Sequence, residues 1–123
     1  MKLGCQHIVV RTSDISNAKD FYINKLGLEV LEDAQNFFAA KAGNVRLSFF
    51  EGYDKHETGE DAKTGFSVIF RTDNLDKAKE DVIEKGIKIN GDIIDIPNFH
   101  RFLELEDPDG NIVFLGEYYV EPV

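Results

Sequence analysis

Two stretches of the chain repeat one order of hydrophobic and polar positions. A β-rich run over 7–12 is followed by polar residues, and an i, i+4 apolar stripe then predicts an amphipathic helix over 16–26. A second β-rich run covers 66–71 and is followed by a second helical pattern over 76–85. Both halves therefore begin with a strand and continue into a helix.

Each predicted helix has candidate residues for its two ends. Ser16 and Asp76 are the residue types that cap helix N-termini, and Gly27 and Gly86 are placed to end the helices in the left-handed conformation. Three short strands are expected after each helix, near 28–31, 36–40 and 45–50 in the first half and near 87–89, 102–106 and 112–118 in the second.

The two halves also align residue by residue. Arg11-Thr12 falls on Arg71-Thr72, Gly27 on Gly86, and Gly43-Asn44-Val45 on Gly110-Asn111-Ile112. Such matches, all in one order, indicate an internal duplication. The sequence predicts an α+β fold of two βαβββ modules, 1–52 and 65–123, joined by a polar linker over 53–64 within a single domain of 123 residues.

The charge and the cysteine content limit the classes of binding partner and the cell compartment that we expect. The formal charge of −9 and the pI near 4.7 oppose binding to nucleic acid or to an anionic membrane, because both need a basic face. No run approaches the roughly 20 apolar residues of a membrane span. The single cysteine, Cys5, agrees with a reducing compartment, so we expect a cytoplasmic protein.

Three motifs carry a resemblance to a known family. They are His7-Ile8-Val9-Val10-Arg11-Thr12-Ser13-Asp14-Ile15, then Phe21-Tyr22 through Leu26-Gly27-Leu28-Glu29-Val30, and lastly Arg101 with Asp107-Pro108-Asp109-Gly110-Asn111. Together they resemble the glyoxalase/bleomycin resistance/dioxygenase (vicinal oxygen chelate) superfamily. The resemblance implies a curved, mixed eight-stranded sheet that surrounds an open cleft, with the helices outside.

The resemblance also implies where a metal ion would be held. Metal-dependent members of the superfamily use His or Glu from the first and last strands of each module, and here those positions correspond to His7, Leu47, Ser67 and Phe114. Phe and Leu cannot coordinate a divalent ion, so we expect no metal and no other cofactor. A non-standard set of Cys5, His7, Glu51 and His100 stays open as an alternative.

Side-chain alternation then assigns residues to the expected cleft. If His7 faces the cleft, the parity places Leu47, Phe49 and Glu51 there from the first module. The second module would add Ser67, Phe114 and Tyr118, with Arg101 near the mouth. A mostly apolar cleft with a few polar groups suits a small organic ligand. The predicted ligand-binding residues are His7, Leu47, Phe49, Ser67, Arg101, Phe114 and Tyr118.

Three functions fit this interpretation. The first is a metal-free protein that holds a largely apolar organic ligand without transforming it. The second is a metal-dependent enzyme with altered ligands, such as a glyoxalase-like lyase, an isomerase or a dioxygenase. The third is an interaction module whose cleft is filled by its own side chains. A homodimer is expected, because exposed sheet edges favour pairing with a second copy.

Overall fold

The chain is described by a computed structural model that covers residues 1–3, 5–51 and 66–123. It divides into two compact units, Met1–Lys55 and His56–Val123, which are named module one and module two below. The predicted linker over 53–64 lies outside the described residues. No helix in the described part of the chain is long and apolar enough to cross a membrane.

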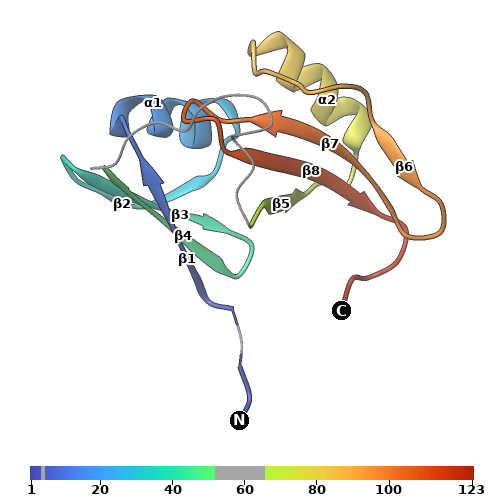
Figure 1. The fold of residues 1–123 in the computed structure, drawn as a ribbon, viewed down its shortest axis with the longest axis horizontal. Coiled ribbons are helices and arrows are strands. Elements are labelled where there is room, and N and C mark those ends of the chain that lie inside the picture. The colour runs from blue at the N-terminus through green and yellow to red at the C-terminus, as the bar shows by residue number, and fades with distance from the viewer. Residues whose placement is uncertain (4, 52–65) are drawn as a thin grey trace. The chain divides into compact units, whose positions relative to one another are not determined.

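Module one is a four-stranded mixed sheet with one helical segment. The strand order is β1-β4-β3-β2, in which β1 runs parallel to β4 and the other neighbours are antiparallel. The helical segment passes from α-helix into π-helix and packs against β3 and β4 (Figure 1). The elements are β1 (His7–Thr12), α1 (Ile15–Lys19), η1 (Asp20–Lys25), β2 (Glu29–Asp33), β3 (Phe37–Ala42) and β4 (Val45–Glu51).

Module two repeats this arrangement. Its strand order is β5-β8-β7-β6, with β5 parallel to β8, and its helix packs against β7 and β8 (Figure 1). The predicted duplication is therefore confirmed, and the eight strands form two four-stranded sheets. The elements are β5 (Val68–Arg71), α2 (Leu75–Glu84), β6 (Ile94–Ile96), β7 (His100–Glu106) and β8 (Ile112–Tyr118).

One strand of module two was placed wrongly by the sequence pattern. The run near 87–89 forms only an isolated bridge from Ile89 to Leu105, and the second strand of the repeat is β6 instead. Gly91, at φ 86°, turns the chain before β6, and Asn98, at φ 68°, lies in the turn from β6 to β7. The Pro97-Asn98 turn after an alternating segment was the signal for this hairpin.

Both helices begin earlier than the sequence pattern predicted. The N-cap residues are Asp14 and Asn74, whose side chains accept hydrogen bonds from the backbone N–H of Asn17 and Lys77. The predicted caps Ser16 and Asp76 lie inside the first turn. A capping oxygen must sit ahead of the first helical residue to reach these N–H groups, and only Asp14 and Asn74 have that position. Gly27 and Gly86 have the predicted positive φ after the helices.

The two faces of the module one sheet differ from the predicted assignment. Leu47 and Phe49 are 1% and 0% exposed, and the Phe49 ring contacts Phe38 and Tyr22 of the helical segment. They therefore lie on the helix side, and the prediction that they share a face with His7 was wrong. In the parallel register His7 pairs with Arg46 and Val9 with Ser48, so the residues beside His7 are Arg46, Ser48 and Phe50.

The face assignment can be checked with adjacent phenylalanines. Phe49→Ala should lower the free energy of unfolding by about 3–5 kcal/mol, because it leaves a cavity in the core. Phe50 is 36% exposed, so Phe50→Ala should lower the free energy of unfolding by only about 1 kcal/mol. Urea denaturation of both variants measures the difference, and equal losses would contradict the assignment.

Candidate functional site

The helix-free face of a sheet is defined here as the face that carries no helix of its own module. In module two this face is set by the pairing of Ile69 with Phe114 and of Arg71 with Gly116 across β5 and β8. The antiparallel β7 adds Phe102 opposite Gly116 and His100 opposite Tyr118. The face therefore collects the aromatic side chains His100, Phe102, Phe114 and Tyr118, with Arg71 beside them.

These aromatic side chains form an ordered cluster. The His100 ring stacks on Phe102, with centroids 5.2 Å apart and planes at 23°, and on Tyr118 at 5.2 Å and 14°. Phe114 meets Phe102 edge-on at 5.5 Å, and Phe99 meets His100 edge-on at 4.4 Å. All of them keep some solvent exposure. The rings of Phe102, His100 and Tyr118 are nearly parallel, and these three residues are called the aromatic ladder below.

A glycine makes room for the ladder. A Cβ at Gly116 would lie 3.0 Å from Ile69 Cγ2 and 3.4 Å from Tyr118 Cε2. The Tyr118 ring therefore lies against the glycine, and a side chain at this position would press first on Ile69. The absence of a side chain at Gly116 is part of what positions the ladder.

The ladder contains one polar atom without a partner. Nδ1 of His100 is buried and makes no hydrogen bond. A buried polar atom without a partner costs free energy, so such atoms are uncommon in folded proteins. Two carboxylates farther along β7 do have partners. Glu104 and Glu106 both accept hydrogen bonds from Asn90, and Glu106 also forms an ion pair with Lys88.

The helix-free face of module one carries a polar cluster around His7, beside a stacked pair of phenylalanines, Phe37 and Phe50, whose centroids are 5.2 Å apart. His7 Nε2 lies 2.7 Å from Ser48 Oγ, and Arg46 Nε donates to the same oxygen at 3.1 Å. Arg46 also forms an ion pair with Glu32 at 3.1 Å. Ser48 is only 1% exposed, so its hydroxyl is not presented to a substrate. The His7 imidazole is therefore already engaged by a side chain of its own sheet.

The structure changes one of the four expected metal positions. Arg11 pairs with Phe50, whereas its counterpart Arg71 pairs with Gly116, so the residue equivalent to Phe114 is Ser48 and not Leu47. The positions are then His7 and Ser48 in module one, and Ser67 and Phe114 in module two. Ser67 is exposed just before β5. Two hydroxyls, one phenyl ring and an engaged imidazole do not fit a divalent ion.

The non-standard metal set is not assembled within module one. Glu51 accepts a hydrogen bond from the backbone N–H of Ile15 at 3.1 Å, which places its carboxylate on the helix side and away from His7. Cys5 is exposed. Among the described residues, no group of three or more His, Cys, Asp or Glu side chains is arranged to hold a metal ion.

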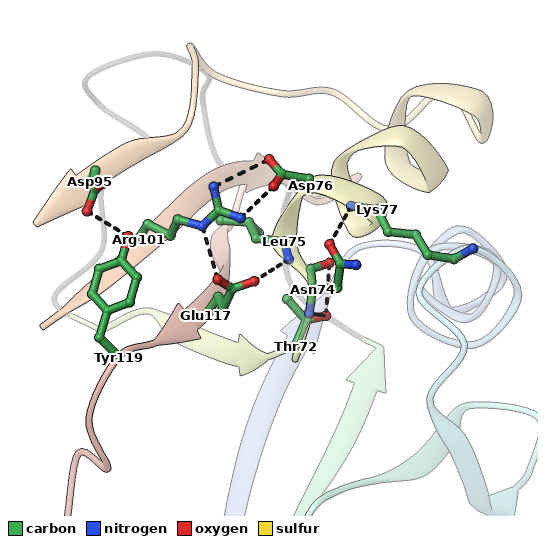
Figure 2. A network of polar contacts seen from close by, with 9 residues as sticks. All are labelled: Thr72, Asn74, Leu75, Asp76, Lys77, Asp95, Arg101, Glu117 and Tyr119. Carbon is green, nitrogen blue, oxygen red and sulfur yellow. Dashed lines mark hydrogen bonds and ion pairs between the residues drawn. The ribbon is translucent and has the colours of Figure 1, made fainter.

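Arg101, predicted near the cleft mouth, lies on the helix side of module two. Figure 2 shows its guanidinium between two carboxylates: Nε donates to Glu117 at 3.2 Å, and Nη2 donates to Asp76 at 2.8 Å. Glu117 also accepts from the backbone N–H of Leu75 at 2.9 Å. Arg101 thus ties β7 and β8 to the start of α2, and its placement in the binding face was wrong.

This network shifts the acidity of its members. The pKa of Glu117 is lowered, first by the hydrogen bond from the Leu75 backbone and then by the one from Arg101. The pKa of Asp76 is lowered by its hydrogen bond from Arg101. Both carboxylates therefore stay charged to a lower pH than an ordinary aspartate or glutamate does.

Sequence reasoning thus found part of the aromatic face. Phe114 and Tyr118 were predicted to bind a ligand and do lie together on one face. Phe102 was missed, and His100 was considered only as a metal ligand. The alternation of His100, Phe102 and Glu104 along β7 was the available signal.

The fold and its paired modules define a class of α+β protein with duplicated βαβββ units. The family model for the Glyoxalase/Bleomycin resistance protein/Dioxygenase superfamily matches residues 4–115, and the chain belongs to this superfamily.

Individual relatives agree with this assignment. The uncharacterized protein YwkD of Bacillus subtilis is 27% identical, with 84% of this chain and 88% of YwkD covered. A superfamily member from Sphaerobacter thermophilus has a TM-score of 0.72 and 26% identity over 94% of this chain and 98% of its own. TnmS3, an antibiotic binding protein from Streptomyces sp. CB03234, has a TM-score of 0.74 and 23% identity over 95% and 97%.

The Glu117 network predicts a specific dependence of stability on pH. Because the folded-state pKa of Glu117 is lowered, its stabilisation is present above the ordinary value of 4.5 and is lost as the pH falls through the folded-state pKa. Glu117→Gln should destabilise the protein at pH 7, and the gap from wild type should shrink on acidification to pH 3. Urea denaturation across this range measures the gap, with Glu80→Gln on the exposed side of α2 as the control. A constant gap would contradict the network.

Proposed function

We propose that the protein binds a small, planar, largely apolar organic molecule against the aromatic ladder of module two, without a metal ion. The observation that carries this proposal is the ladder itself. His100, Phe102 and Tyr118 present nearly parallel rings that remain partly exposed on a helix-free face. A soluble chain gains nothing from leaving such rings in contact with water unless another surface covers them.

The contacts favour a planar ligand. Offset stacking on an aromatic ring adds about 0.5–1.5 kcal/mol beyond the burial of apolar area. Nδ1 of His100 is buried among the rings without a partner, so a ligand polar group that enters between the rings would complete its hydrogen bond, as acceptor or donor according to the tautomer. A planar ring system with one polar group therefore matches both features.

The residues at the family's metal positions support binding without metal. Phe114 contributes a ring to the aromatic face, and Ser48 satisfies the His7 imidazole. Both side chains serve other contacts in this protein. TnmS3 is described as an antibiotic binding protein, and at 23% identity it supports the proposal only as a protein of the same fold with a ligand-holding role.

The setting we propose is the cytoplasm, with the protein as a homodimer. The outer strands support dimerisation, since Val30 and Leu31 on β2 and Ile94 and Ile96 on β6 are exposed apolar side chains. Exposed edge strands of this kind favour pairing with a second chain.

Light scattering at micromolar concentration should give a mass near twice the 13.9 kDa of one chain. Ile94→Lys on the short edge strand β6 and Val30→Lys on β2 should show which edge is used, because a buried lysine opposes association. A monomer mass for the wild-type protein would contradict the proposed dimer.

Ligand binding is tested by removing one ring of the ladder. Tyr118→Leu keeps an apolar side chain but loses stacking, so we expect the affinity for a planar aromatic ligand to fall by about three- to tenfold. Tyr119→Leu is the matched control, because Tyr119 points to Asp95 with its hydroxyl group. Calorimetry on a hit from a thermal-shift screen of aromatic compounds measures both affinities.

The same titration tests whether ligand binding depends on a metal ion. With EDTA in the buffer, affinity and melting temperature should be unchanged. A loss of binding in EDTA that Ni²⁺ or Mn²⁺ restores would contradict metal-free binding, and equal affinities of the two tyrosine variants would place the ligand elsewhere.

A further inference from the structure

Arg71 ends β5 beside the aromatic ladder and is held in a recognisable geometry. Its guanidinium carbon lies 5.6 Å from the centroid of the Tyr118 ring, a cation–π contact that extends the ladder by one planar group. The other arginine of module two, Arg101, lies on the helix side and is bound to Asp76 and Glu117. Arg71 is therefore the arginine that module two offers to its aromatic face.

A carboxylate already occupies this arginine. Nη1 of Arg71 donates to Glu121 Oε2 at 2.9 Å, and Nη2 donates to Oε1 at 2.7 Å, which is a two-pronged pairing. This geometry is the one in which arginine recognises planar carboxylates. Glu121 lies in the segment that follows β8, outside any helix or strand. The chain thus shows how a carboxylate is bound at the end of the ladder.

This internal pairing is easy to exchange. The Arg71 and Glu121 side chains are 47% and 68% exposed, and exposed ion pairs contribute little to stability. A ligand whose ring stacks on the ladder would bring its own carboxylate to Arg71 at high local concentration. Such a ligand would displace Glu121 at small cost.

We propose that Arg71 is the carboxylate subsite of the aromatic face, that the preferred ligand is a planar aromatic carboxylic acid, and that Glu121 is its intramolecular competitor. This inference rests on the proposed function, because the ladder must bind the ring. It adds a chemical class to the ligand and a role to the C-terminal segment. The net charge of −9 does not oppose it, since the acidic group meets a local cation stacked on an aromatic ring.

The test compares two probes that differ only in charge, 2-naphthoate and 2-naphthamide, by calorimetry. Wild type should bind the acid about fivefold or more tightly than the amide, because hydrogen bonds to charged groups are the stronger ones. Arg71→Gln should remove this preference by weakening binding of the acid to about the level of the amide. Glu121→Gln should raise the affinity for the acid about two- to fivefold, because it removes the competing carboxylate. The affinity for the amide should stay unchanged.

Arg11 supplies the matched control. It holds the position in module one that Arg71 holds in module two, so Arg11→Gln changes the net charge by the same amount and should not alter either affinity.

The outcomes separate this inference from the proposed function. If both probes bind equally and Arg71→Gln changes neither, the carboxylate subsite is overturned while aromatic binding stands. If neither probe binds to wild type, both are overturned. A Glu121→Gln protein with wild-type affinity for the acid would overturn the competitor role.

Discussion

The helix in each module packs on the face of the sheet that buries its apolar side chains, and one hydrogen bond, made once in each module, ties the start of that helix to a strand end. Glu51 at the end of β4 and Glu117 near the end of β8 accept from the first backbone N–H of the helix, at 3.1 Å from Ile15 and 2.9 Å from Leu75. A carboxylate at this point satisfies an N–H group that the helix cannot satisfy itself and meets the positive end of the helix dipole. The bond therefore fixes the start of the helix on the face where the apolar core already holds it, and the other face carries no helix of its own module.

The two modules use their helix-free faces differently. Module one ties His7, Ser48 and Arg46 into a closed polar cluster, whereas module two lines up aromatic rings with a free imidazole nitrogen and an arginine. The same duplication thus carries a hydrogen-bonded polar cluster on one sheet and a row of aromatic rings on the other. Module two also reinforces its helix contact with Arg101 and Asp76, where module one has Asn36 and Ser16 at the corresponding positions.

The sequence predicted the repeated fold because the pattern, the order of elements and the glycine positions all agreed. It did not determine the face of β4, because Leu47 and Phe49 alternate with Ser48 and Phe50 and each set contains a phenylalanine. A register counted from the preceding turn was one residue off, and such a slip moves every side chain to the other face. Arg101 was misplaced because its charge does not reveal which carboxylates surround it; only the pairing of β7 with β8 does.

We propose that a planar molecule binds on the helix-free face of module two. Two-dimensional NMR of the wild-type protein during titration with 2-naphthoate tests it most directly, because ring currents shift the protons that lie next to a bound aromatic ring. We predict the largest shifts for the methyl groups of Ile69 and the ring protons of Tyr118 and His100, with little change at Leu103 and Leu105 on the helix side. Shifts that centre on Leu103 and Leu105, or on module one, would contradict the account.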